Sequence, residues 1–222
     1  MRAVIFANGI IEDDLGALAL LRPDDLVIAA DGGGAHCRRL GITPGVILGD
    51  LDSLHQDDLE YWSEQGVQII HHDRRKDETD LELALLQAQS VGRDEALVLG
   101  GLGGRWDHTF ANLLLPAYHR LEDLRVTFWH SGLWIYLVRR SRQIHGLPGQ
   151  TVSLIPVGGD VHGVTTHGLE WPLNGETLAF GATRGVSNVL VEDTATVQVR
   201  HGILLCFLFD GDGDIPSLQD ER

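Results

Sequence analysis

The chain has 222 residues, which is enough for one large domain or two small ones and for a substantial hydrophobic core. Its 32 Asp and Glu residues outnumber its 17 Lys and Arg residues, so the formal net charge is −15. This balance argues against a protein that binds nucleic-acid phosphates or anionic membrane surfaces, and an anionic substrate would need a metal ion in order to bind.

The two cysteines and the first residues bear on where the protein works. Cys37 and Cys206 lie far apart and form no metal-ligand spacing, so we expect a reducing compartment and no disulfide framework. The stretch MRAVIFANGIIEDD lacks the long apolar region and cleavage site of a signal peptide, and no apolar run reaches the length of a membrane span. We therefore expect a cytoplasmic protein with no membrane partner and no nucleic-acid partner.

The first two thirds of the chain alternate short β-branched runs with helical patterns, which is typical of a parallel α/β sheet. The expected strands are residues 3–7, 26–30, 46–48, 67–70, 96–99 and 126–129. The expected helices are residues 15–21, 35–40, 59–65, 81–89 and 109–119. The helix at residue 81 has the strongest pattern, since its apolar residues recur at helical spacing and Thr79-x-x-Glu82 fits a capping box.

Helical periodicity disappears after about Ser141. Short strand-like runs such as TVSLIPV, TVQVR and ILLCFLF then follow one another, separated by Gly, Pro and Asn. This pattern predicts a smaller antiparallel β domain. We therefore expect an α/β domain over residues 1–140, an all-β domain over residues 141–212, and an acidic, turn-rich tail over residues 213–222 that frays.

Acidic residues gather where successive expected strands end. In an open parallel sheet, ligands bind beyond the carboxyl ends of the strands, so these positions bear on function. Each Asp taken alone is more often an ordinary turn or capping residue than a ligand, but a set of them at one edge favours a common function. Four strand-to-helix junctions carry six aspartates, which are Asp31, Asp50, Asp52, Asp77, Asp80 and Asp107.

The spacing of these aspartates indicates a divalent cation. If Asp50-Leu51-Asp52 stays extended, both carboxylates point to one side, and Asp77 and Asp80 share a face at the start of a helix. Clustered carboxylates repel one another, and a hard divalent cation with oxygen ligands removes that repulsion. We therefore predict Mg²⁺ at Asp50, Asp52, Asp77 and Asp80.

Two glycine-rich turns supply the other half of a phosphate site. The runs at residues 32–34 and 100–104 lie between an expected strand and an expected helix, where backbone N–H groups and the helix dipole can hold phosphate. Neither run is a nucleotide fingerprint, because no GxxxxGK[ST] exists and Trp106 stands where the last glycine of GxGxxG belongs. Arg105 and Lys76, the only lysine of the chain, are the natural counter-charges for phosphate oxygens.

Taken together, these segments resemble the thiamin pyrophosphokinase family. The resemblance implies an α/β catalytic domain followed by a β-sandwich domain, paired as a homodimer with thiamin held between the subunits. It also implies transfer of the terminal pyrophosphoryl group of ATP to the hydroxyl of thiamin, with Mg²⁺ and release of AMP. The matching motifs occur in order as DGGGAH from residue 31, GDLDSL from 49, KDETD from 76, GGLGGRWDH from 100, GLEWPL from 168 and GVSN from 185.

The resemblance implies roles residue by residue. The catalytic and metal-binding group would be Asp50, Asp52, Asp77 and Asp80. Trp171 matches the tryptophan that packs on thiamin, with Ser187 and Asn188 as its polar neighbours. The nucleotide site would be formed by Asp31, Gly32, Gly33, Lys76, Thr79, Gly103, Gly104, Arg105, Asp107 and His108.

Four positions depart from the family pattern, and one of them bears on the substrate. Glu170 stands where a lysine commonly precedes the tryptophan, which changes the charge beside the expected thiamin ring. The other three departures, at His36, Gly45 and Leu51, leave the acidic cluster intact. A pyrophosphokinase for another hydroxymethyl heterocycle, such as a pterin, therefore stays open. From other classes, a phosphatase with Asp50 as nucleophile and a non-catalytic thiamin-binding module stay open as well.

Overall fold

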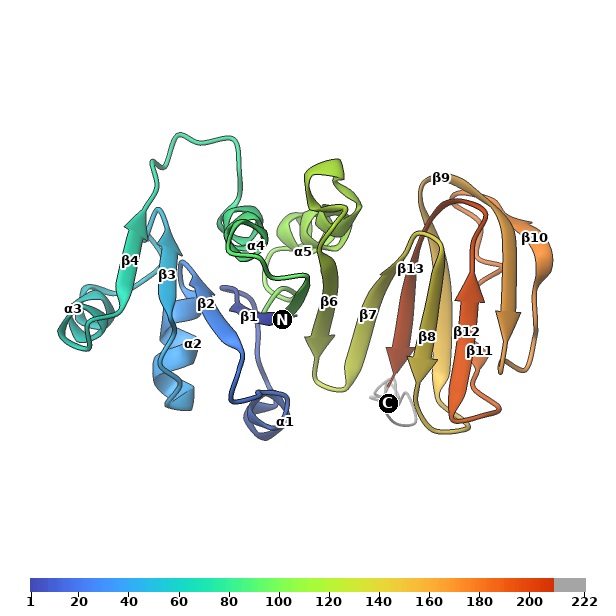
Figure 1. Ribbon diagram of the computed structural model, residues 1–222, viewed down its shortest axis with the longest axis horizontal. Helices are drawn as coiled ribbons and strands as arrows, with labels where there is room; N and C mark the ends of the chain where they lie inside the picture. The colour runs from blue at the N-terminus through green and yellow to red at the C-terminus, as the bar shows by residue number, and fades with distance from the viewer. Residues whose placement is uncertain (210–222) are drawn as a thin grey trace, which may run out of the picture. The chain divides into compact units, whose positions relative to one another are not determined.

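The structure is a computed structural model that describes residues 1–209 of the chain. It divides into two compact units, the first comprising Met1–Ser131 and the second beginning at Gly132. Figure 1 labels their helices and strands. The expected acidic tail, residues 213–222, lies outside the described residues. Within the described range, no helix is both long enough and apolar enough to cross a membrane.

The first unit is built on six parallel strands (Figure 1), whose spatial order is β4-β3-β2-β1-β5-β6. The central strands β1 and β5 are buried almost throughout, as expected for a parallel sheet that is covered on both faces. All six strands predicted from the sequence are confirmed, with ends that differ by one residue at most. They are Arg2–Phe6 (β1), Leu26–Ala30 (β2), Val46–Gly49 (β3), Gln68–His71 (β4), Glu95–Leu99 (β5) and Arg125–His130 (β6).

The strand order reverses beside β1. The chain runs outward from β1 through β2 and β3 to β4, then crosses back to β5 on the other side of β1. Because such crossovers are right-handed, α1, α2 and α3 cover one face of the sheet and α4 and α5 the other. A crevice therefore opens beyond the carboxyl ends of β1 and β5, where sheets of this kind bind ligands. The helices are Asp14–Ala19 (α1), Gly33–Leu40 (α2), Gln56–Glu64 (α3), Asp80–Ser90 (α4) and Trp106–Leu114 (α5).

Local sequence signals set the ends of the helices near this crevice. Thr79 caps α4, and its hydroxyl accepts a hydrogen bond from the Glu82 N–H over 3.2 Å, so the predicted cap is confirmed. α5 ends at Leu114 and is followed by two short 3₁₀ helices, η1 (Leu115–Ala117) and η2 (His119–Leu121). The prediction of one helix through residue 119 is wrong, because Pro116 has no N–H to donate to the helical ladder.

The second unit is an antiparallel β-sandwich. The long strand β9 belongs to both sheets. In one sheet, its first half pairs with β11 and β13, and β13 also pairs with β7. In the other sheet, its last residues pair with β10 and β12, and β12 also pairs with β8. Apolar side chains from both sheets fill the core between them. The predicted fold class is confirmed. The strands are Leu133–Val138 (β7), Ser141–His145 (β8), Thr151–His167 (β9), Asn174–Leu178 (β10), Asn188–Val189 (β11), Thr194–Gln198 (β12) and His201–Phe209 (β13).

Strand β7 shows where the sequence pattern and the structure divide the chain differently. The pattern assigned residues 133–138 to the first domain, whereas β7 pairs with β13 of the second unit, from Leu133 opposite Phe209 to Val138 opposite Leu204. The run LWIYLV is apolar throughout, so no alternation marked it as a sandwich strand. The break falls instead between Ser131 and Gly132, at a tight turn in which these residues have φ values of 46° and 83°.

Candidate active site

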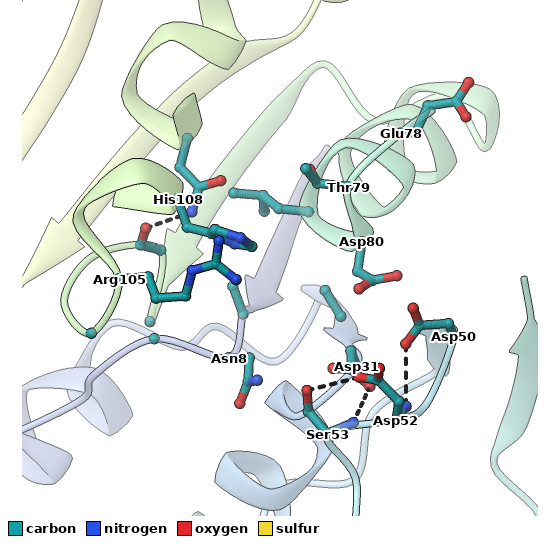
Figure 2. A pocket seen from close by; sticks show the side chains of 18 of the residues that line it. Asn8, Asp31, Asp50, Asp52, Ser53, Glu78, Thr79, Asp80, Arg105 and His108 are labelled. Atoms are coloured by element: carbon teal, nitrogen blue, oxygen red, sulfur yellow. Dashed lines mark hydrogen bonds between the residues drawn. The ribbon is translucent and has the colours of Figure 1, made fainter. Parts of the chain in front are cut away.

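A cavity of about 530 Å³ lies at the crevice of the first unit (Figure 2). Its walls come from the segments that follow β1, β2, β3, β4 and β5 and from α4 and α5. Asp77, Gly32, Gly33 and Asp107, although predicted for the site, are not among its lining residues. The predicted metal and nucleotide residues that do line it are Asp31, Asp50, Asp52, Lys76, Thr79, Asp80, Gly103, Gly104, Arg105 and His108.

Three carboxylates, which we call the acidic trio, form one side of the cavity. Asp31 follows β2, Asp50 and Asp52 follow β3, and one oxygen of each lies within 4.8 Å of the others. Asp31 is only 4% exposed, and this burial raises the pKa of its carboxyl group. Partial burial acts in the same direction on Asp50, but the Asp52 N–H and the charge of Lys76 outweigh it and lower the pKa of Asp50. Acidic groups this close are stabilised by a cation or a shared proton.

Two left-handed residues bring the acidic trio together. Asp31 has a φ of 48° and Leu51 a φ of 61°, values that L-residues seldom adopt. The Asp52 N–H donates to Asp50 Oδ1 over 3.2 Å, and the Ser53 N–H donates to Asp31 Oδ1 over 3.4 Å (Figure 2). The prediction that Asp50-Leu51-Asp52 is extended is therefore wrong. The chain turns at Leu51, and hydrogen bonds within the turn direct the carboxylates toward the cavity.

Lys76 lies against the acidic trio from the loop before α4. Its Nζ is 2.9 Å from Asp80 Oδ1 and 3.7 Å from Asp50 Oδ2, and its side chain is only 13% exposed. Burial alone would lower the pKa of Lys76, but the hydrogen bonds and charges of these two carboxylates raise it above its ordinary value. The ammonium group is therefore a permanent positive charge at this wall.

Asp80 and Asp77 separate in the structure. Asp80 is the first residue of α4 and lines the cavity, and Gly49 leaves room for it, because a Cβ at Gly49 would lie 2.9 Å from Asp80 Oδ1. Asp77 is exposed. The prediction that the two share a helical face is wrong, since Thr79 caps the helix and Asp77 therefore belongs to the preceding loop.

The glycine-rich turn after β5 forms the opposite wall, where Figure 2 shows Arg105 and His108. Gly103 and Gly104 have φ values of 85° and 71°, and no atom lies within 4 Å of the place where a Cβ on Gly104 would stand. The backbone here is thus open to a ligand. Arg105 pairs with Asp107 over 2.5 Å, and this hydrogen bond lowers the pKa of the exposed Asp107 to about 2.

The glycines after β2 pack closely against β1 and the segment that follows it. A Cβ on Gly32 would lie 2.1 Å from Asn8 Oδ1, and a Cβ on Gly33 would lie 1.9 Å from the Phe6 carbonyl oxygen. Only glycine lets α2 approach β1 this closely. Both glycines, which were predicted for the nucleotide site, hold α2 against the strand that presents Asn8 to the cavity.

Several residues of the cavity wall were missed by the sequence analysis. Asn8 follows β1, and Asn112 on α5 donates from its side chain to a carbonyl of the glycine-rich turn over 2.8 Å. Arg74 pairs with Asp52 over 3.1 Å, and Ser53 Oγ donates to Asp52 Oδ1 over 3.2 Å. Asn8, Ser53 and Arg74 each lie within four residues after a strand end, which is the signal that could have found them. Asn112 lies on α5 and carries no such signal.

The acidic trio has the chemistry that a hard divalent cation requires. Carboxylate oxygens are the ligands that Mg²⁺ prefers, with water and phosphate oxygens completing its shell. Oxygens within 4.8 Å of one another can share a single ion. Of the predicted metal ligands, Asp50 and Asp52 belong to this group, Asp80 instead contacts Lys76, and Asp77 lies away from the cavity.

A second pocket, of about 310 Å³, lies within the second unit and brings together the three residues predicted for thiamin. Asn188 fixes the backbone of Trp171, because its Oδ1 accepts the Trp171 N–H over 3.1 Å and its Nδ2 donates to the Trp171 carbonyl over 2.7 Å. Trp171 is 57% exposed, which leaves aromatic surface for a ligand. Ser187 follows on the same wall and has a left-handed φ of 62°.

One ion pair lies at the lining of this pocket. Arg184 lines the pocket and is neutralised by Glu176, with which it forms a salt bridge. Glu170, the departure from the family pattern, is exposed and is not part of the lining. Its backbone N–H donates to the Val189 carbonyl over 2.9 Å, so its main chain supports the segment that carries Trp171.

Two family models match the chain, one in each unit. The model described as "Thiamin pyrophosphokinase, catalytic domain" matches residues 17–128, and the model described as "Thiamin pyrophosphokinase, vitamin B1 binding domain" matches residues 137–204. The chain belongs to the thiamin pyrophosphokinase family. The resemblance seen in the sequence is thereby confirmed.

Relatives within the thiamin pyrophosphokinase family occur in plants and bacteria. Thiamine pyrophosphokinase 1 of Oryza sativa subsp. japonica is 31% identical over 170 residues, and thiamine pyrophosphokinase 1 of Arabidopsis thaliana is 32% identical over 172. Each match covers 72% of this chain and 64% of the relative, so the chain spans just under two thirds of these plant proteins. Thiamine pyrophosphokinase of Bacillus subtilis is 28% identical over 191 residues, which is 81% of this chain and 85% of the relative.

Solved structures of the thiamin pyrophosphokinase family share the fold described above. The crystal structure of thiamine pyrophosphokinase from Bacillus subtilis has a TM-score of 0.85 at 25% identity and covers 96% of this chain and 100% of that one. Thiamin pyrophosphokinase from Candida albicans has a TM-score of 0.78 at 18% identity, with coverage of 94% and 90%. The similarity therefore extends over both units.

Proposed function

We propose that this chain is a Mg²⁺-dependent thiamin pyrophosphokinase, which transfers the terminal pyrophosphoryl group of ATP to the hydroxyl of thiamin and releases AMP. The observation that carries the proposal is the acidic trio, which lies at the switch point of the unit that matches the catalytic-domain model. The relatives described above, which are themselves named thiamine pyrophosphokinases, support the proposal.

The proposed reaction needs positioning and charge neutralisation rather than a protein nucleophile. The hydroxyl oxygen of thiamin attacks the β-phosphorus of ATP and loses its proton. The bond between that phosphorus and the α,β-bridging oxygen breaks, and AMP leaves with that oxygen. This chemistry agrees with a cavity whose polar lining includes carboxylates, cations, amides, hydroxyls and glycine backbone.

Both walls of the cavity would take part. Asp31, Asp50 and Asp52 would hold the metal ion, which neutralises phosphate charge when it is bound. On the opposite wall, the backbone around Gly104 and the guanidinium of Arg105 would contact phosphate oxygens, with the N-terminus of α5 behind them. The residues therefore hold the transferring group between an acidic side that carries metal and a side that offers N–H donors.

The pocket around Trp171 would hold the acceptor. The thiazolium ring of thiamin carries a positive charge, which suits an indole face through a cation–π interaction worth about 0.5–2 kcal/mol. Asn188 keeps the segment that carries Trp171 in place, and Ser187 offers a polar group beside it. The pocket thus combines an aromatic face for the cation with polar groups that can orient the rings.

We favour thiamin over another hydroxymethyl heterocycle as the acceptor. The reason to consider a pterin was the charge of Glu170, and that side chain is exposed and outside the pocket lining. The family model that matches this unit is described as vitamin B1 binding. We therefore keep thiamin as the acceptor, and a comparison of acceptors in one assay tests this choice.

We further propose a cytoplasmic homodimer. Cys37 and Cys206 are both buried and free, and burial raises the pKa of each thiol to about 12, which suits a protein that keeps its thiols reduced. The dimer follows from the family resemblance, in which thiamin lies between subunits. Light scattering after size-exclusion chromatography measures it directly, and a mass near 24.3 kDa would refute the dimer.

One product assay tests the proposed function. Purified protein is incubated with ATP, Mg²⁺ and thiamin, and nucleotides and thiamin diphosphate are separated by chromatography. The proposal requires AMP and thiamin diphosphate in equal amounts. ADP as the stoichiometric product, inorganic phosphate without thiamin diphosphate, or faster turnover of a hydroxymethylpterin than of thiamin would each refute it.

A further inference from the structure

Lys76 occupies an unusual position between two carboxylates of the cavity. Its ammonium lies 2.9 Å from Asp80 Oδ1 and 3.7 Å from Asp50 Oδ2, and its side chain is largely buried. Asp50 also belongs to the acidic trio, whose oxygens are close enough to share one cation. Asp50 is therefore the point at which the only lysine of the chain and a bound metal ion would meet.

Two positive charges on one carboxylate oppose each other. The attraction that holds the ammonium to Asp50 weakens when Asp50 also serves a dication, and the two cations repel over a few ångströms of partly buried space. A metal ion that binds alone must therefore work against Lys76. A polyphosphate that arrives with the metal offers the ammonium new anionic oxygens and removes the conflict.

We propose that Lys76 is an internal counter-cation, which competes with the divalent metal for Asp50 and transfers to a phosphate oxygen when nucleotide binds. The proposal rests on the proposed function, because it takes a metal-bound nucleoside triphosphate as the ligand of the cavity. Lys76 thereby couples the two ligands, so metal alone binds weakly to the acidic trio, and nucleotide and metal together bind cooperatively.

The type of residue fits this role. A lysine ammonium is a compact charge on a flexible stem, so it can change partners without the fixed two-pronged geometry of a guanidinium. Arg74 supplies a contrast on the same cluster, because it pairs with Asp52 Oδ2 over 3.1 Å but its side chain is 79% exposed. Solvent screens that pair, so Arg74 competes weakly with a metal ion. The two cations thus provide a matched test.

The first experiment compares Lys76→Met with Arg74→Met, which remove the same charge from neighbouring carboxylates. Binding of Mn²⁺ alone is measured by electron paramagnetic resonance, and binding is measured again with a non-hydrolysable ATP analogue. For Lys76→Met we expect Mn²⁺ alone to bind about fivefold tighter or more, and the analogue with Mn²⁺ to bind about fivefold weaker or more. For Arg74→Met we expect a smaller change in both. Unchanged or weaker binding of Mn²⁺ alone to Lys76→Met overturns the proposal.

The second experiment uses the unaltered protein and therefore does not depend on the folding of a variant. Because the chain contains a single lysine, labelling with ¹⁵N-lysine gives one side-chain ammonium signal in NMR spectra. We expect this signal to shift when Mg²⁺ and the ATP analogue are added together, and to shift in a different direction with Mg²⁺ alone at high concentration. A signal that keeps its position in all three states overturns the exchange of partners.

These tests can be separated from the product assay of the proposed function. If thiamin diphosphate and AMP form but Lys76→Met binds Mn²⁺ like the unaltered protein, the counter-cation role fails and the proposed function stands. If Lys76→Met binds Mn²⁺ more tightly but neither product forms, the competition at Asp50 stands and the proposed function fails.

Discussion

The two edges of the parallel sheet differ in how their charged groups are paired. At the amino edge, positive and negative groups pair closely: Arg2 meets Asp25 over 2.6 Å, and Arg125 meets Asp94 and Glu95 over 3.1 and 2.8 Å. At the carboxyl edge, the three carboxylates of the acidic trio crowd within 4.8 Å of one another. The amino edge is therefore paired charge by charge, whereas the carboxylates lining the carboxyl edge, Asp80 and the acidic trio, outnumber the two cations that pair with them, Lys76 and Arg74.

The paired charges of the amino edge contribute to stability, whereas the crowded carboxylates of the carboxyl edge serve function. A buried pair such as Arg2–Asp25, with side chains 13% and 2% exposed, satisfies both charges and fixes the starts of β1 and β2. Crowded carboxylates instead cost free energy in the absence of a cation, and natural proteins retain such arrangements where a site requires them. Substitutions at the two edges should therefore have opposite effects on activity and on stability.

Asp50→Asn should give the largest effect on activity. It removes one charge from the acidic trio, and we expect turnover to fall about 10²-fold or more, by analogy with the loss of one electrostatic group from a preorganised site. The melting temperature should change little, because the relief of repulsion within the acidic trio and the loss of the pairing with Lys76 act in opposite directions. Steady-state kinetics and calorimetry measure both. Asp123→Asn, an exposed position outside the cavity, is the matched control, and turnover of Asp50→Asn equal to that of this control would contradict the assignment.

Asp80→Asn and Asp77→Asn sharpen the boundary of the site. Asp80 lines the cavity and contacts Lys76, so we expect its substitution to lower kcat/KM about tenfold or more through the loss of a charged partner. Asp77 is exposed in the loop before α4, so its substitution should change kcat/KM much less. Equal losses in the two variants would mean that the loop closes Asp77 onto the ligand.

Trp171→Ala tests whether the acceptor depends on the second pocket. Loss of a cation–π interaction of about 0.5–2 kcal/mol should raise the KM for thiamin severalfold or more and leave the affinity for ATP nearly unchanged. Trp171→Phe keeps an aromatic face, so its KM for thiamin should lie between that of the unaltered protein and that of Trp171→Ala. Initial rates at varied thiamin and varied ATP separate these effects. An unchanged KM for thiamin in Trp171→Ala would move the acceptor away from this pocket.

Asp25→Asn should affect stability alone. It breaks the buried pair with Arg2 and should lower the free energy of unfolding by about 3 kcal/mol near neutral pH, while kcat and KM stay unchanged at low temperature. A loss of activity without a loss of stability would contradict the contrast between the two edges.

The stabilisation that Asp25 provides should depend on pH in a defined direction. Burial alone would raise the pKa of Asp25, but hydrogen bonds from Arg2 and Arg22 lower it below its ordinary value of 3.8. The folded protein therefore binds this proton less readily, so the stabilisation is complete above that value and is lost as the pH falls through the lowered pKa. Denaturant titrations should show the difference between the unaltered protein and Asp25→Asn shrinking at acidic pH.

Much of the fold could be predicted from the sequence because its signals are local. Apolar runs of four or five residues marked the parallel strands, and Thr79 marked the start of α4. The position of Asp31 and Asp50 directly after strands was enough to place them at the carboxyl edge, since parallel strands all end there. Trp171, Ser187 and Asn188 do not follow parallel strands, so they could be found only through their resemblance to the family motifs.

The rest depends on contacts between distant residues. The turn at Leu51 requires a left-handed residue that no propensity favours, and it is held by hydrogen bonds that form only when Asp50 and Asp52 are placed. The packing role of Gly32 appears only when α2 meets Asn8. Arg74 pairs with Asp52 from the loop after β4, and the sequence does not show that this loop approaches Asp52.

Anomalous diffraction from crystals grown with Mn²⁺ and a non-hydrolysable ATP analogue would show whether the acidic trio binds the metal ion. This assignment predicts an anomalous peak within about 2.2 Å of oxygens from at least two members of the acidic trio, with a phosphate oxygen completing the contact. Nucleotide bound in the cavity without a metal ion at Asp31, Asp50 or Asp52 would contradict it.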